Sequence, residues 1–154
     1  MAGTEPSTYD EETSLSFELG AKTLLLDNTL QGSLAAYYYT YDDLQLTFFD
    51  GGAQLTDNVA EASGYGAELE LLWVPGERWD IYFTLAYSDT EVEDTNQSFI
   101  AIGGCDDCEG NELPFAPEWT TSTVITHHFP LAGDSEIFVT GEHSYTDSMY
   151  AYID

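Results

Sequence analysis

Residues 63–73 alternate between apolar and polar side chains with a period of two, so neighbouring side chains fall on opposite faces of an extended strand. The apolar face carries Tyr65, Ala67, Leu69, Leu71 and Trp73. The other face carries Gly64, Gly66, Glu68 and Glu70. Such a strand either hides its apolar face in the core of a soluble β-sandwich or presents it to lipid in a membrane barrel, with its carboxylates in the lumen.

The same period recurs along the chain and predicts six strands in all. These cover Thr13 to about Leu26, Thr29 to about Phe49, Asp57–Val74, Arg78 to about Asp94, Glu118–Phe129, and Ser135 to about Tyr150. Turn residues such as Asp27-Asn28 and Pro75-Gly76 separate them. We therefore predict an all-β fold of antiparallel, up-and-down strands.

The connections between these strands predict which kind of sheet they form. Connections near residues 27, 76 and 132 are short, whereas those at about 50–57 and 95–116 are expected to be long loops. Short turns at one end and long loops at the other are typical of outer-membrane barrels, as are strands that exceed the roughly 9–11 residues needed to cross a bilayer. Aromatic residues lie toward both ends, where a barrel has its interfacial girdles: Trp73, Trp79 and Phe129 beside the short turns, and Tyr37, Tyr39, Tyr41, Tyr87 and Trp119 toward the long loops.

Composition narrows the possible partners. The 154 residues contain 2 Lys and Arg against 29 Asp and Glu, which gives a formal net charge of -27. Nucleic acid is therefore excluded as an electrostatically favourable partner, and aromatic residues at regular positions argue against disorder. The acidity indicates solvated loops, a high-salt habitat or cation binding. We find no apolar run long enough for a membrane helix, and no signal peptide.

Several short motifs, in this order, resemble the barrel of TonB-dependent outer-membrane receptors. They are Ser16-Phe17-Glu18-Leu19-Gly20-Ala21-Lys22, Leu26-Asp27-Asn28-Thr29-Leu30, Ala35-Ala36-Tyr37-Tyr38-Tyr39, Asp42-Asp43-Leu44-Gln45-Leu46, Asp57-Asn58-Val59-Ala60-Glu61-Ala62, Tyr65-Gly66-Ala67-Glu68-Leu69-Glu70 and Leu113-Pro114-Phe115-Ala116-Pro117-Glu118-Trp119. The resemblance extends over about residues 12–150.

This resemblance implies a barrel of about 22 strands in the outer membrane of a Gram-negative bacterium, with a separate plug domain in its lumen. Members of the family import iron chelates, cobalamin, nickel complexes or oligosaccharides, using energy that TonB delivers through the plug. The sequence departs from the complete pattern, since it has no plug, no TonB box and no terminal aromatic strand after Ile153-Asp154. We therefore expect residues 13–154 to be part of the barrel domain and residues 1–12 to be a polar extension. Its expected partners are outer-membrane lipid, the plug and the remaining strands.

Each candidate site in the sequence also has a plainer structural role. Cys105 and Cys108 are predicted to form a disulfide in an outer loop, because no second ligand pair suits zinc. Asp106, Asp107, Glu109 and Glu112 are interpreted as solvated charge rather than a calcium site. His127 and His128 point to opposite faces of a strand and cannot share a metal, while His143 lies on a neighbouring strand. Glu18, Glu68, Glu70 and Asp80 are expected to line the lumen and contact the plug.

These observations predict a receptor and transport role rather than an enzyme, with no catalytic residue, metal site or cofactor. The outer loops would contribute to substrate capture, and four aromatic residues are candidate substrate contacts: Phe48, Phe49, Phe99 and Phe115. The alternative is an acidic soluble β-sandwich that acts as a binding or adhesion module.

Overall fold

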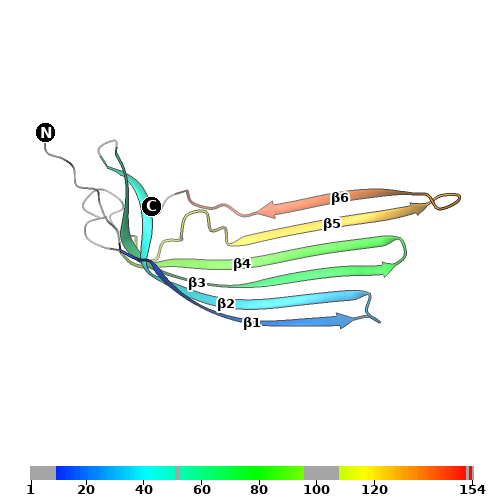
Figure 1. Ribbon diagram of the computed structural model, residues 1–154, viewed down its shortest axis with the longest axis horizontal. Coiled ribbons are helices and arrows are strands. Elements are labelled where there is room, and N and C mark those ends of the chain that lie inside the picture. The colour runs from blue at the N-terminus through cyan, green and yellow to red at the C-terminus, as the bar shows by residue number, and fades with distance from the viewer. Residues whose placement is uncertain (1–9, 51–52, 96–107, 152, 154) are drawn as a thin grey trace.

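The computed structural model describes residues 10–50, 53–95, 108–151 and 153, and for residues 47–50, 53–55, 57 and 59 it describes the backbone only. Six strands form one sheet: β1 (Thr13–Leu25), β2 (Leu30–Asp50), β3 (Ala53–Gly76), β4 (Trp79–Thr95), β5 (Trp119–Pro130) and β6 (Glu136–Thr146). Each strand pairs antiparallel with the next along the chain (Figure 1). The predicted up-and-down meander is confirmed.

The strand register places the apolar side chains of the alternating segments on one side of the sheet. Leu19 pairs with Ala36, Ala36 with Ala67, and Ala67 with Tyr87, so one row of apolar residues runs across four strands. We call this side the apolar face and the opposite side, which carries Glu18, the polar face. The apolar face is uncovered, with Leu19 81% exposed. Because all six strands lie in one sheet, no second sheet of the described chain covers this face, and the soluble-sandwich alternative is wrong.

Three short connections lie together at one end of the sheet, which we call the turn end (Figure 1). Between β1 and β2, residues Leu26, Asp27 and Asn28 all have positive φ, and the Thr29 N–H donates to the Leu26 carbonyl at 3.1 Å. Between β5 and β6, Gly133 adopts φ 78, and the Leu131 N–H donates to the Ser135 carbonyl at 2.9 Å. The predicted tight turns are therefore present at this end.

The connection between β2 and β3 differs from the prediction of a long loop over residues 50–57. The two strands remain paired to Asp50 and Ala53, so most of that region is a hairpin. A bulge lies between Tyr41 and Leu44, where Asp43 adopts φ 57. Beyond it the hairpin bends away from the plane of the sheet (Figure 1). The prediction was wrong because backbone pairing continues after the apolar alternation fades, and a bulge absorbs the bend.

At the end opposite the turns, a small core lies between the strand extensions. Ala60, Val92, Cys108 and Ile153 are buried there, and Leu44, Leu46 and Leu113 pack against them. The β6 strand ends at Thr146, short of the predicted position near Tyr150. We call this region the outer end. No helix with the length and apolar content of a membrane span occurs within the described residues.

Candidate functional site

The polar face has a row of tyrosines along β2 that lies over two glycines of β3. Tyr37 pairs with Gly66, and Tyr39 pairs with Gly64. A Cβ atom built on Gly64 would lie 2.5 Å from the Tyr39 ring carbon Cζ, so the absence of a side chain is what admits the ring. The Tyr37 and Tyr39 rings are stacked with centroids 6.2 Å apart. The sheet thus presents a continuous aromatic strip on its polar face.

This placement corrects one sequence-based interpretation. Tyr37, Tyr39 and Tyr41 were expected to belong to an interfacial girdle, but pairing of Tyr37 with Glu18 puts them on the polar face. Side chains alternate strictly along a strand, so consecutive tyrosines at every second position cannot share a face with Tyr38. The other predicted girdle residues keep their places, because Tyr87 pairs with Trp119 and the two rings lie 4.7 Å apart on the apolar face.

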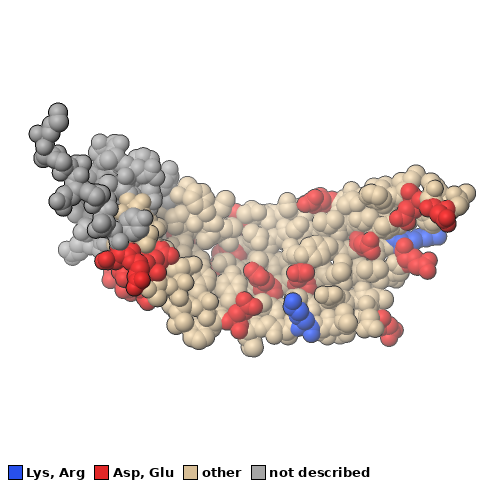
Figure 2. Space-filling model, viewed as in Figure 1, with Lys and Arg blue, Asp and Glu red and all other residues tan. Residues whose placement is uncertain are grey.

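Carboxylates dominate the charge of the polar face. Glu18 pairs with Tyr37, Glu68 with Ala35, and Glu70 with Ser33, so these three acids lie near one another across β1, β2 and β3. Lys22, which pairs with Ser33, supplies one positive charge in the same region. Figure 2 shows red acidic side chains spread along the molecule, with blue basic ones in two places. The face therefore carries a net negative potential.

A polar triad joins three consecutive strands near the turn end. His128 Nε2 lies 2.9 Å from Asp80 Oδ2, and His128 Nδ1 lies 3.2 Å from Glu136 Oε1. All three side chains are partly exposed. A histidine that contacts a carboxylate through each ring nitrogen has no nitrogen left for a metal ion. Sequence reasoning placed Asp80 on this face but missed the triad, because the contact depends on the β4–β5 and β5–β6 registers.

The loop that leads into β5 is fixed to the outer end of β4. The Val92 N–H donates to the Asn111 carbonyl, and the Gly110 N–H donates to the Val92 carbonyl, both at 2.9 Å. The Leu113 N–H donates to Thr90 Oγ1 at 3.0 Å. Cys108 is 1% exposed and disulfide-bonded. Its predicted partner Cys105 lies outside the described residues, so that pairing stays a prediction.

The candidate substrate contacts are only partly described. Phe115 is 69% exposed, adopts φ 59, and donates its N–H to the Tyr150 carbonyl at 2.9 Å. The backbones of Phe48 and Phe49 pair with Leu55 and Gln54, but their side chains are not described. Phe99, together with Asp106 and Asp107, lies outside the described residues. Their role as contacts stays a prediction.

No group of metal-ligating side chains occurs among the residues that the structure describes. Glu109 is exposed and Glu112 is half-buried. His127 and His128 lie on opposite faces, as predicted, since His127 pairs with Trp79 on the apolar face. The sheet therefore has an acidic, tyrosine-rich polar face and, on its opposite side, the apolar face.

The chain belongs to the family of TonB-dependent receptor-like β-barrels, because the model of that family matches residues 2–152. It is thus part of an outer-membrane barrel of a Gram-negative bacterium, with the polar face toward the lumen and the apolar face toward lipid. Members of this family are transport receptors.

Among curated proteins, the chain is similar to the pesticin receptor of Yersinia enterocolitica serotype O:8, with 35% identity over 127 residues. That alignment covers 80% of this chain and 17% of the receptor. The pesticin receptor of Yersinia pestis is 34% identical, with the same coverage of both chains. The chain therefore spans about a sixth of the length of the curated relatives it matches.

Two solved structures share the fold. The crystal structure of the ferric yersiniabactin uptake receptor from Yersinia pestis superposes with a TM-score of 0.73 and 19% identity, covering 93% of this chain and 20% of that one. The siderophore receptor from Acinetobacter baumannii superposes with a TM-score of 0.55 and 23% identity, covering 74% of this chain and 16% of that one. At these identities the likeness concerns the fold alone.

The side chains of the apolar face mark where the hydrocarbon would begin and end. Trp79 lies beside the turn at one end of β4, and Asp89 lies on the same face further along that strand. Asp89 Oδ2 accepts hydrogen bonds from the Tyr65 hydroxyl at 2.8 Å and the Tyr87 hydroxyl at 3.1 Å. The stretch from Trp79 through Tyr87, with both ends included, matches the roughly 9–11 residues that a tilted strand needs to cross a bilayer.

Proposed function

We propose that residues 13–154 form one section of the wall of a receptor that imports a ferric siderophore, with residues 1–12 as a polar extension. The observation that carries the receptor part of this proposal is the 35% identity to a pesticin receptor over 127 residues. The two solved structures with this fold are a ferric yersiniabactin uptake receptor and a siderophore receptor. Among iron chelates, cobalamin and oligosaccharides, these names favour the iron chelate.

The polar face supports a role in holding a plug. Glu18, Glu68 and Glu70 lie near one another across neighbouring strands, and a wall of carboxylates attracts basic groups on a plug that fills the lumen. The plug and the remaining strands are therefore the proposed partners, and TonB acts on the receptor through the plug. The His128 triad would lie near the periplasmic opening, because short turns face the periplasm in such barrels.

The outer end supports a role in substrate capture. The bent β2–β3 hairpin and the loop that contains Phe115 both extend past the apolar band, at the end opposite the short turns (Figure 1). This end faces the exterior when the short turns face the periplasm. An exposed aromatic ring held on a backbone with φ 59 suits contact with the apolar parts of a chelate.

Growth of a strain that lacks its own siderophore receptors tests the proposal. The complete receptor containing this segment is expressed in iron-limited medium with a ferric siderophore as the sole iron source, in parallel with cobalamin and oligosaccharide uptake assays. We expect uptake of labelled ferric siderophore that depends on the receptor and disappears in a strain without TonB. Uptake of cobalamin or an oligosaccharide in place of the chelate, or iron uptake unaffected by loss of TonB, would contradict the proposal.

A further inference from the structure

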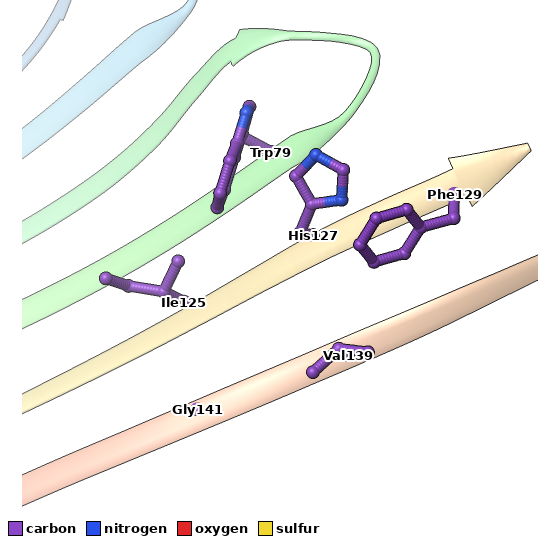
Figure 3. A pocket seen from close by; sticks show the side chains of 6 residues that line it. All are labelled: Trp79, Ile125, His127, Phe129, Val139 and Gly141. Carbon is purple, nitrogen blue, oxygen red and sulfur yellow. The ribbon is translucent and has the colours of Figure 1, made fainter.

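The apolar face is not smooth. A groove of about 530 Å³ crosses it near the turn end, lined by side chains of β4, β5 and β6 (Figure 3). Its lining residues are Trp79, Ile125, His127, Phe129, Val139 and Gly141. The groove is shallow and open on its outer side rather than an enclosed cavity. None of the lining residues is part of the uptake route proposed above, which follows the opposite face.

The shape of the groove follows from one glycine and three rings. Gly141 pairs with Ile125, and a Cβ atom built on Gly141 would meet nothing within 4 Å, so the floor is open there. The His127 ring lies between Trp79 and Phe129, with centroid distances of 4.2 Å to each. Figure 3 shows these rings along β4 and β5, with Val139 and Gly141 facing them from β6. The groove is thus lined by three rings close to the turns and by the aliphatic side chains of Ile125 and Val139.

Besides the indole nitrogen of Trp79, His127 supplies the polar group of this groove. Its Nδ1 atom is buried and has no hydrogen-bond partner among the described residues, whereas Nε2 is not buried in this way. Because Nδ1 is enclosed by protein, Nε2 is the ring nitrogen that can donate a hydrogen bond to an acceptor outside the protein. A donor at the level of the aromatic girdle is positioned for the glycerol ester and phosphate oxygens of a phospholipid, which lie near the interface.

The geometry points to a bound phospholipid of the periplasmic leaflet, with one acyl chain in the groove and a glycerol or phosphate oxygen on His127 Nε2. The groove is continuous with the lipid-facing surface, so a hydrocarbon chain is the molecule that meets it. The turn end faces the periplasm, which favours a phospholipid over the lipopolysaccharide of the opposite leaflet. A second copy of the chain is disfavoured, because each copy carries a net charge of -27.

Native mass spectrometry of the complete receptor, titrated with phosphatidylethanolamine, tests the site. We expect Gly141→Leu, which fills the groove, to weaken binding of one phosphatidylethanolamine roughly tenfold. Gly141→Ala should cause a smaller loss and keeps the test open if the larger side chain impairs folding. His127→Phe preserves the ring but removes the donor, so binding should weaken about fivefold. The matched control is Ala36→Leu, on the apolar face of β2 and remote from the groove, which should bind as the wild type does.

Four results would overturn the proposal. The first is equal phosphatidylethanolamine binding by the wild type, Gly141→Leu and Gly141→Ala, and the second is unchanged binding by His127→Phe. The third is that the Gly141 variants lose bound lipopolysaccharide rather than phospholipid. The fourth is a receptor dimer that Gly141→Leu dissociates. Heat-modifiable mobility on a gel reports whether each variant is folded. Siderophore uptake by the variants should be unaffected, so failure of this site and failure of the uptake proposal are distinguishable.

Discussion

At the scale of single residues, tyrosines of β2 pack so closely over Gly64 and Gly66 of β3 that neither glycine has space for a Cβ atom. A Cβ atom on Gly66 would overlap both the Tyr37 hydroxyl and the Tyr87 backbone oxygen. In each pair the tyrosine ring covers backbone that the glycine leaves without a side chain. The pairs also fix the register, because a slip of one residue would move each ring to the other face of the sheet. The aromatic strip is therefore also a register device.

We expect Gly66→Ala to destabilise the folded barrel by about 1–3 kcal/mol, because the added methyl has no space without displacing a ring or the backbone. Urea unfolding of the complete receptor in detergent, followed by tryptophan fluorescence, measures this change. Gly32→Ala is the matched control, since its Cβ would lie 3.5 Å from Leu71 Cδ2, an ordinary contact. Equal unfolding midpoints for the two variants would contradict the packing argument.

Phe115 provides a residue-scale test of substrate capture. Its ring is 69% exposed at the outer end, so truncation should leave the fold intact. If the ring contacts the ferric siderophore, Phe115→Ala should weaken binding roughly 5- to 30-fold, as loss of an aromatic anchor does, whereas Phe115→Tyr should stay near wild type. Equilibrium binding to whole cells measures this. Leu131→Ala also truncates an exposed apolar side chain, but at the turn end, and is the control. The same loss of siderophore binding in both variants would exclude a specific contact of Phe115.

At the scale of elements, the outer end is stabilised separately from the membrane strands. Val92 is fully buried and exchanges two backbone hydrogen bonds with the loop that contains Gly110 and Asn111. The Leu113 N–H adds a hydrogen bond to Thr90 Oγ1. These contacts lie outside the membrane strands, so we expect the loop to open at a lower cost than unfolding of the sheet. The outer end can thus change conformation while the barrel wall stays paired.

We expect Val92→Ala to release this loop, since loss of two buried methyl groups should cost about 1–3 kcal/mol locally. Hydrogen exchange of the Gly110 and Val92 amides should accelerate by at least roughly tenfold, while amides in the middle of β3 keep their protection. Val74→Ala removes the same atoms from a side chain that is 37% exposed, and should leave exchange unchanged. Uniform acceleration across β3 and the loop would show that the outer end is not an independent unit.

The strands could be predicted from the sequence because an alternation with a period of two shows directly which face of the strand each side chain lies on. The bounds of β1, β4 and β5 lie within a few residues of those expected. The β2–β3 hairpin was missed because, outside the membrane, neither face requires apolar residues and the alternation is lost while the backbone pairing continues. The Asp80–His128–Glu136 triad required the β4–β5 and β5–β6 registers, which the alternation along each strand does not reveal.

At the scale of the whole molecule, the described chain is an open sheet with two edges, β1 and β6. The unpaired N–H and C=O groups along these edges have no partner in lipid, and leaving them unpaired in hydrocarbon costs several kcal/mol per group. Closure with further strands removes both edges. Lipid covers the apolar face in the assembled barrel, so this face needs no protein core behind it.

The isolated 154-residue chain should therefore neither insert stably as a monomer nor transport ligand, because its two edges would remain open in the bilayer. Planar-bilayer recording after refolding into detergent should show no discrete conductance, and the chain should aggregate through its edge strands when detergent is diluted. The complete receptor, prepared identically, is the control for refolding. A monodisperse, detergent-free monomer would contradict the lipid-facing assignment of the apolar face, whereas a discrete conductance would show that these strands close a pore by themselves or by self-association.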